Sequence, residues 1–286
     1  MHQKETVIAP LFAQELGITV TVPDHFDSDR FGTFTRDVAR EGTQQQAARA
    51  KANAVLDGLG GTVAIASEGA FFPDPMLPFV AYNRELVVLV DREYDLEIIG
   101  QASSNQTNFS HKTIQSVEEA LEFAATAQFP SHGLVVMPDA DCADPGVIVK
   151  GIVTETALIQ AVEIALRASP TYGSSSHDSS SHGSSTRSVH IETDMRAMYN
   201  PTRMEAIAAA TRDLITTIQR VCPNCGRPGF SKVGTRPGLP CGLCHLPTEL
   251  VLADVYQCAG CQHREEKRYP NGIRTADPGQ CWNCNP

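Results

Sequence analysis

Short apolar runs alternate with amphipathic segments through the first 220 residues. Five runs rich in β-branched and aliphatic residues are expected to form strands, at 62–67, 85–91, 96–100, 133–138 and 146–153. Several of these runs are almost wholly apolar, as strands covered on both faces are. A shorter strand is expected at "VHIET" (189–193). The pattern predicts an α/β fold, with a mixed sheet and flanking helices.

The segments between the expected strands carry helix-start signals. Four helices are expected, and each has a suitable residue at its start: Thr43, Ser116, Thr154 and Pro201. Ser116 and Glu119 have the spacing of a capping box, and Gly58 is expected to end the first helix. These boundaries predict helices that pack between or beside the strands.

One stretch interrupts the alternation. The segment "GSSSHDSSSHGSSTRS" (173–188) is low in complexity and nearly free of apolar side chains. Such a composition is typical of a flexible loop. Because a strand and a long helix follow it, we interpret it as an insertion in an α/β domain that spans residues 1–220.

The remaining residues, 221–286, are dominated by cysteine. Eight of the nine cysteines form four pairs with two residues inside each pair: Cys222/Cys225, Cys241/Cys244, Cys258/Cys261 and Cys281/Cys284. A two-residue gap directs both sulfurs at one ion, and two such knuckles make a tetrahedral Cys₄ site. The spacing predicts two structural Zn²⁺ ions in a small ribbon-like module. With so little apolar sequence, this module is expected to need metal in order to fold.

Three pairings of the knuckles are compatible with this spacing. Sequential pairing joins the first knuckle to the second and the third to the fourth. Nested pairing joins the second to the third, across a hairpin expected in 245–257 with its corner at Ala253–Asp254, and the first to the fourth. Cross-braced pairing joins the first to the third and the second to the fourth. The expected hairpin favours the nested arrangement.

The balance of acidic and basic residues indicates which classes of partner the protein binds. Residues before Cys222 carry 16 basic and 28 acidic side chains, a balance that suits small-molecule chemistry better than binding to nucleic acid or a membrane. The module has seven basic and five acidic side chains, and eight thiolates with two Zn²⁺ add about four negative charges. Nucleic acid is therefore an unlikely ligand, whereas contact with a protein partner suits the module.

The N-terminal segment and the hydropathy suggest where the protein works. "MHQKETVIAPLF" lacks the features of a signal peptide, and no apolar run is long enough to span a membrane. Since zinc thiolates also suit a reducing compartment, we expect a cytoplasmic protein without a membrane partner.

Polar residues gather where the first two expected strands meet the helix before them. Ser67 and Glu68 stand where a buried strand ends, and Thr43 opens a helix that carries Lys51. Arg84 and Asp91 flank the next strand. Strand ends and helix N-termini are common sites for anions and their metal ions. Each residue taken alone also fits an ordinary cap or a solvated charge.

A second polar constellation lies at 191–204, "IETDMRAMYNPTRM". If its first part is a strand, Glu192, Asp194 and Arg196 share one face. Asn200 and Arg203 then lie at a helix start, where they could complete an anion pocket. A capped helix entry with local ion pairs explains the same residues.

The order of these features resembles that of the inosine/xanthosine triphosphatase type of pyrophosphatase. The resemblance covers residues 36–91 and rests on "EGTQQQAARAKANAVL" followed by "TVAIASEGAF". It implies that Glu68 binds a divalent metal and that Lys51 contacts phosphate. The phosphate-binding N-terminal loop of that family has no counterpart in "VIAPLFAQELG".

The whole chain is also similar to an uncharacterised bacterial family in which an α/β domain precedes a double zinc knuckle. The stretches that carry this similarity are "IASEGAFFPDPMLPF", "NRELVVLVD", "IETDMRAMYNPTRM" and the four CxxC pairs. The resemblance implies the architecture and the zinc sites but no reaction.

Two functional hypotheses follow. In the first, the protein is a Mg²⁺- or Mn²⁺-dependent hydrolase of a nucleotide or another phosphorylated small molecule. Glu68 and Asp91 would hold the metal, and the substrate would contact Thr43, Lys51, Ser67, Arg84, Asp194, Arg196, Asn200 and Arg203. In the second, it is a non-catalytic adaptor whose zinc module binds protein or RNA. The hydrolase hypothesis requires the polar stretches to line one cavity.

Overall fold

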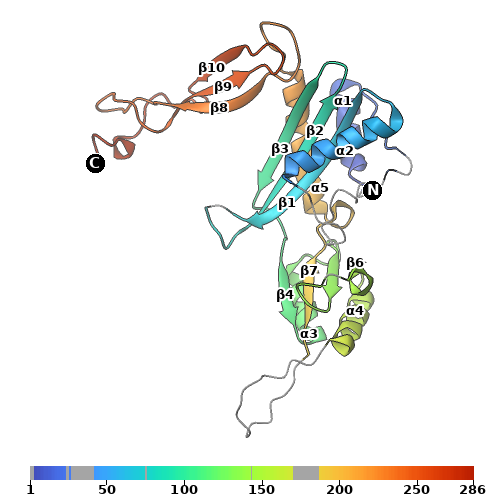
Figure 1. Ribbon diagram of the computed structural model, residues 1–286. Helices are drawn as coiled ribbons and strands as arrows, with labels where there is room; N and C mark the ends of the chain where they lie inside the picture. The colour runs from blue at the N-terminus through green and yellow to red at the C-terminus, as the bar shows by residue number, and fades with distance from the viewer. Residues whose placement is uncertain (1–2, 24–25, 27–41, 75, 143, 170–186) are drawn as a thin grey trace.

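The computed structural model describes residues 3–23, 26, 42–74, 76–142, 144–169 and 187–286. Helices and strands are interspersed as expected, and a small module with a sheet of its own follows them (Figure 1). The strands form three separate sheets rather than one mixed sheet, and the paired strands within each are antiparallel. The predicted Ser-rich insertion lies, except for its last two residues, outside the described residues.

The first sheet has the order β1-β2-β3. It consists of β1 (Val63–Pro73), β2 (Ala81–Asp91) and β3 (Leu96–Ser104). The connections between these strands are too short for the crossover that parallel neighbours need, so the strands pair as hairpins. All three runs were predicted as strands, and each strand extends beyond its apolar run.

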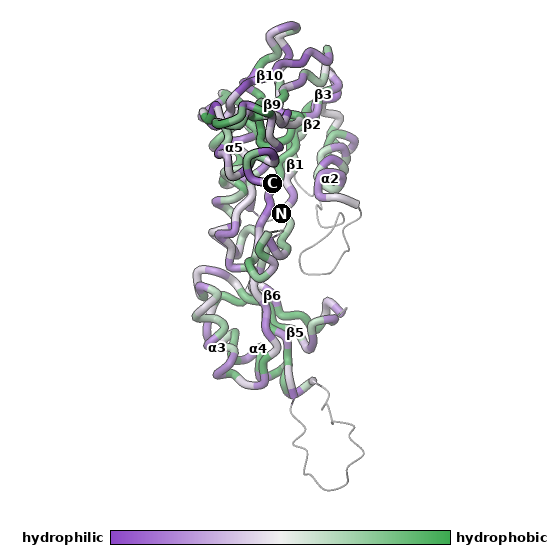
Figure 2. The backbone as a smooth tube through the Cα atoms, turned by 90° about the vertical axis from the view of Figure 1, so that its left-hand side faces the viewer, coloured by the Kyte–Doolittle hydropathy of each residue, from purple (hydrophilic) through white to green (hydrophobic). Residues whose placement is uncertain are grey.

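Helices cover both faces of this sheet. Figure 2 shows α2 (Gln44–Leu59) on one side of the strands and α5 (Pro201–Gln219) on the other. The second face also receives α1 (Glu5–Leu16), a helix that the apolar pattern did not predict. This three-layer arrangement explains why the central strand β2 is apolar on both faces.

Two glycines set details of this packing. α2 continues past Gly58 to Leu59, so the predicted end at Gly58 is wrong. Its C-terminal cap is Gly60, whose φ of 68° lies in the left-handed region that favours glycine. At Gly100 in β3, a Cβ atom would lie 2.2 Å from the backbone N of Leu214 in α5. Glycine therefore lets this helix approach the sheet closely.

The second sheet has the order β4-β7-β5-β6. Its strands are β4 (His111–Ile114), β5 (Leu134–Met137), β6 (Val149–Ile152) and β7 (Val189–Thr193). The helices α3 (Val117–Thr126) and α4 (Glu155–Ala168) pack their apolar sides on one face of it. Ser116 and Thr154 cap these helices as predicted. The run at 146–153 is only partly a strand, since it begins as the 3-10 turn η2 (Pro145–Val147).

The C-terminal sheet has the order β10-β9-β8. It contains β8 (Ser231–Pro237), β9 (Val251–Gln257) and β10 (Arg264–Arg268). The hairpin corner predicted at Ala253–Asp254 is wrong, because both residues lie inside the continuous strand β9. Asp254 is tolerated there since its carboxylate is 2.7 Å from Lys232 Nζ on the neighbouring strand.

Two short 3-10 turns complete the described elements, η3 (Ala197–Tyr199) before α5 and η4 (Pro278–Gln280) before the last knuckle. Among the described helices, none has both the length and the apolar character required to cross a bilayer.

Candidate metal centres and a charged cluster

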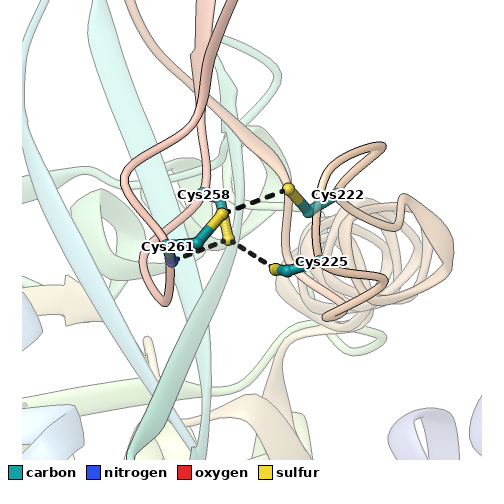
Figure 3. A group of neighbouring side chains, drawn as sticks. All are labelled: Cys222, Cys225, Cys258 and Cys261. Atoms are coloured by element: carbon teal, nitrogen blue, oxygen red, sulfur yellow. Dashed lines mark hydrogen bonds between the residues drawn. The ribbon is translucent and has the colours of Figure 1, made fainter.

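The first group of cysteines, which we call the proximal tetrad, joins the first knuckle to the third. Cys222 and Cys225 follow α5, and Cys258 and Cys261 form the turn between β9 and β10. The four side chains point toward one another (Figure 3). The Sγ atoms of Cys222 and Cys261 are 3.7 Å apart, and those of Cys225 and Cys258 are 3.6 Å apart.

The second group, the distal tetrad, joins the second knuckle to the fourth. Its Sγ atoms are 3.8 Å apart for Cys241 and Cys284 and 3.6 Å apart for Cys244 and Cys281. The chain end is held in this group by two hydrogen bonds. The Asn285 backbone N–H donates to the Cys281 carbonyl (2.8 Å), and its side-chain amide donates to the Gly279 carbonyl (2.9 Å).

The spacing of the sulfurs fits a tetrahedral metal site. Four thiolates at about 2.3 Å from a Zn²⁺ ion lie roughly 3.8 Å from one another. The observed separations match this value in both tetrads, and an all-sulfur tetrahedral site suits zinc. The two tetrads are the only groups of three or more metal-ligating side chains found among the described residues.

The pairing of the knuckles is cross-braced, so the nested arrangement favoured by the sequence is wrong. β8 and β9 are antiparallel, and Ser231 at the start of β8 faces Gln257 at the end of β9. The knuckle before β8 and the knuckle after β9 therefore meet at one end of the sheet. The other two knuckles meet at the opposite end, about 20 Å away along a seven-residue strand.

Nitrogen donors support the sulfurs of both tetrads. The Asn224 side chain donates to Cys261 Sγ (3.5 Å), and the backbone N–H of Leu243 donates to Cys241 Sγ (3.4 Å). Such bonds stabilise thiolates and fix the orientation of metal ligands.

A separate cluster of charges surrounds Ser67, Glu68 and Gly69 of β1. Glu68 is buried, and its carboxylate is 2.7 Å from Lys51 Nζ on α2. The buried Gln44 amide donates to the carbonyls of Glu68 (2.6 Å) and Arg84 (2.8 Å). Arg84 in turn donates to the Gln44 side chain (2.8 Å). The start of α2 and the "SEG" stretch therefore lie side by side. The strand end predicted at Ser67 and Glu68 is wrong, because β1 continues to Pro73 and both residues lie inside it.

A second ion pair lies beside Gly69. Arg203 Nε donates to Glu85 Oε1 at 2.7 Å, and both side chains are fully buried. Arg203 also donates to the Met195 carbonyl. A Cβ atom at position 69 would lie 2.5 Å from both Arg203 Nη2 and Glu85 Oε1. The glycine therefore makes room for this pair.

Lys4, just before α1, completes the cluster. Its ammonium nitrogen is 3.4 Å from the Ser67 carbonyl oxygen, and the side chain is half-buried. Burial, together with the nearby Arg203 guanidinium, lowers the pKa of Lys4 to about 7. We call Lys4, Lys51, Glu68, Glu85 and Arg203 the central cluster.

The two ion pairs of the central cluster lie on opposite faces of the first sheet. Glu68 contacts α2, whereas the next strand directs Glu85 toward α5. Asp91 is further away, because its register partner on β1 is Val63, about 17 Å along the strand from Glu68. The Asp91 carboxylate accepts hydrogen bonds from the backbone N–H groups of Glu93 and Tyr94 in a turn. The predicted Mg²⁺ or Mn²⁺ site of Glu68 with Asp91 is therefore not assembled.

Other predicted site residues have local structural roles. Thr43 and Gln46 form a capping box at the start of α2, with Thr43 Oγ1 accepting the Gln46 backbone N–H at 3.2 Å. Asn200 caps α5 by accepting the backbone N–H of Arg203 at 2.9 Å.

Asp194 and Arg196 lie after β7 rather than within it, so the alternation expected along a strand does not extend to them. They form an ion pair of 2.6 Å, and the Asp194 carboxylate also accepts the backbone N–H of Gly151 (3.0 Å). Arg203 of the central cluster approaches this pair, since it donates to the carbonyl of Met195, which lies between Asp194 and Arg196.

Sequence reasoning missed the roles of three residues. Lys4 carries no local signal, because the apolar pattern did not predict α1. Glu85 was visible only as part of a charged strand start, and Gln44 as an ordinary first-turn residue. The alternation of side chains along β2 is the one signal from which the orientation of Glu85 could have been predicted. Adjacent residues of a strand point to opposite faces, so Glu85 is expected on the face opposite Arg84.

Comparison with known proteins places the chain in a family without naming a reaction. No curated protein and no solved structure matches the chain, so nothing among them supports the resemblance to pyrophosphatases. A family model described as a domain of unknown function, DUF6671, matches residues 51–286, a range that includes both tetrads. The chain therefore belongs to the DUF6671 family.

Proposed function

We propose that the protein is a cytoplasmic adaptor in which residues 221–286 form a zinc module that docks a protein partner, carried by the α/β body at 1–220. Each tetrad would hold one structural Zn²⁺, bound by its four cysteines. Thiolate ligands need a reducing compartment, which supports the cytoplasmic location.

The observation that carries this proposal is the exposure of large apolar side chains around the distal tetrad. Leu243 lies inside the second knuckle and is 68% exposed, and Trp282 lies inside the fourth and is 64% exposed. Leu246, just after the second knuckle, and Ile273, between β10 and the fourth knuckle, are also exposed. We call these four residues the distal tip. Exposed apolar residues gathered in one place often mark a protein-binding surface.

Metal ligation beside these residues would favour their binding to a protein partner. Leu243 and Trp282 are each flanked by cysteines of one tetrad, so a bound ion would fix the backbone that carries them. A rigid apolar or aromatic anchor loses little conformational entropy when a partner covers it. The near-neutral charge of the metallated module favours a protein over RNA as that partner.

The zinc part of the proposal is tested by elemental analysis of the purified full-length protein. We expect about two zinc ions per chain, since four thiolates serve each ion. A value near one, or iron in place of zinc, would contradict the two-site scheme. Cys142→Ser serves as the control, because Cys142 belongs to neither tetrad.

The adaptor part is tested by quantifying proteins retained by the immobilised full chain and by its Trp282→Ser variant. We expect the variant to lose specific partners while it keeps two zinc ions and its thermal transition. Ile164→Ser is the matched control, since Ile164 is 63% exposed on α4, far from the module in sequence. Equal retention by the wild type and the Trp282→Ser variant would reject the distal tip. Retention that nuclease abolishes would favour RNA instead.

A further inference from the structure

A cavity of about 500 Å³ lies where the end of α5 meets the C-terminal sheet. Its walls include Val221 and Pro223, which flank Cys222 of the proximal tetrad, together with Tyr256 of β9 and Lys267 of β10. The cavity therefore lies at the end of the module opposite the distal tetrad. Its volume falls within the range of small-molecule sites, roughly 300–1,000 Å³.

One wall of this cavity holds an arginine side chain against an aromatic ring. Arg220 is half-buried, and its guanidinium carbon lies 5.2 Å from the centre of the Tyr256 ring. Tyr256 in turn packs beside the buried Phe230, with the ring centres 5.9 Å apart. Stacking holds the flat face of a guanidinium group and leaves its N–H edges available. Such an edge can bind a carboxylate through two parallel hydrogen bonds.

The two cations of the lining have no acidic partner within the described part of the chain. Arg220 and Lys267 form neither an ion pair nor a side-chain hydrogen bond there. The two glutamates of the lining, Glu265 and Glu266, are instead 3.2 and 2.8 Å from the nitrogen atoms of a histidine and an arginine outside it. An anion that enters the cavity would therefore meet two cations whose charge is not yet balanced.

We propose that this cavity binds a small aromatic carboxylate. The carboxylate would lie between Arg220 and Lys267, and the aromatic group would cover the apolar surface of Val221 and Pro223. Val221 is 55% exposed, so covering it would remove apolar surface from water. A single negative charge suits the lining better than a phosphate dianion, because the two glutamates would repel a second charge.

The size of the cavity favours a small molecule over a protein as its ligand. A stable protein interface covers about 800 Å² and some 20–30 residues on each partner, whereas eight residues line this cavity. The inference goes beyond the adaptor proposal and does not depend on it, since the distal tetrad lies at the other end of the module.

The test is an NMR titration of the metal-loaded full-length protein with 2-naphthoate and with 2-naphthamide, its uncharged counterpart. We expect the dissociation constant of 2-naphthoate to be about tenfold lower, which is the effect of one charge-assisted hydrogen bond. The backbone amide signals of Val221, Phe230 and Lys267 should shift as 2-naphthoate is added. Those of Leu243 and Trp282 in the distal tip should not.

Substitutions test the two cations separately. Arg220→Met should weaken the binding of 2-naphthoate about tenfold and affect 2-naphthamide much less. Arg220→Lys keeps the charge but loses the planar fork, so its effect should be smaller. Lys267→Met, on the exposed strand β10, should weaken 2-naphthoate several-fold and provides a second test if the Arg220 variants do not fold.

A matched control separates the cavity from the general charge of the protein. Arg212 is an exposed arginine of α5 that does not line the cavity, so Arg212→Met should bind 2-naphthoate as the wild type does. Metal content and the thermal transition show whether each variant is folded.

Four results would overturn the proposal. No detectable binding of 2-naphthoate at millimolar concentration would reject the site. Equal affinities for 2-naphthoate and 2-naphthamide would remove the role of the cations. Unchanged affinity for 2-naphthoate in folded Arg220→Met and Lys267→Met variants would place the probe elsewhere. Shifts at Leu243 and Trp282 without a shift at Val221 would show that the probe binds the distal tip instead.

Discussion

Replacing one cysteine of the distal tetrad should open only one end of the zinc module. Cys284→Ser removes a ligand from the site shared with Cys241, Cys244 and Cys281. The proximal tetrad keeps all of its ligands, because the pairing is cross-braced. We therefore expect zinc content to fall from about two ions per chain to about one.

The size of the expected destabilisation follows from the length of the loop that an ion in the distal tetrad would close. Cys244 and Cys281, which approach each other in this tetrad, are 37 residues apart in the sequence. Closing a loop of that length restricts the unfolded chain by an entropy worth about 4 kcal/mol. The segment between β10 and the C-terminus has little buried apolar surface to offset such a loss, so it should become accessible to protease.

Limited trypsin digestion followed by mass spectrometry measures which peptide bonds have become accessible. In the Cys284→Ser variant the bond after Arg274, between the third and fourth knuckles, should be cut early. Bonds after Arg220 and Arg264 should stay protected, since the proximal tetrad holds their neighbours. The complementary variant Cys225→Ser should expose the bonds after Arg220 and Arg264 and spare the bond after Arg274.

The same map separates the other two pairings. Early cleavage after Arg264 in the Cys284→Ser variant would mean that the third and fourth knuckles share an ion. Early cleavage after Arg220 in the same variant would mean that the first and fourth knuckles share an ion. Either result would refute the cross-braced reasoning.

Three further predictions concern the first sheet. Glu85→Gln removes the carboxylate charge that faces the fully buried Arg203 guanidinium, and it should lower the free energy of unfolding in urea by about 3 kcal/mol. Glu163→Gln, in an exposed ion pair on α4, should lower it by less than about 0.5 kcal/mol, and similar losses in the two variants would contradict a buried, water-free pair. Gly69→Ala should destabilise the fold at least as much as Glu85→Gln, because the added Cβ meets two charged atoms at 2.5 Å, and a neutral result by calorimetry would show that the pair moves freely. The pKa of Lys4 in the folded state lies below its unfolded value, so the folded state binds fewer protons, and the free energy of unfolding should rise from pH 7 toward pH 10. Lys4→Met should reduce this rise, and an identical pH dependence of urea unfolding in the two proteins would contradict the pKa shift.

The sequence by itself determined the features that depend on neighbours along the chain. The strands at 85–91 and 96–100, the caps Thr43 and Thr154 and the four cysteine knuckles were all predicted, and the structure contains them. A capping bond spans three residues and a knuckle spans four, so a short window of sequence contains everything that forms them.

Tertiary structure decided which of these local features meet. The four knuckles are chemically alike, and only the antiparallel pairing of β8 with β9 brings the first to the third. Glu85 and Arg203 are 118 residues apart, and Lys4 and Ser67 are 63 apart. Such contacts form because helices from distant parts of the chain cover particular faces of one sheet, and that choice depends on the packing of the whole core rather than on any short window of sequence.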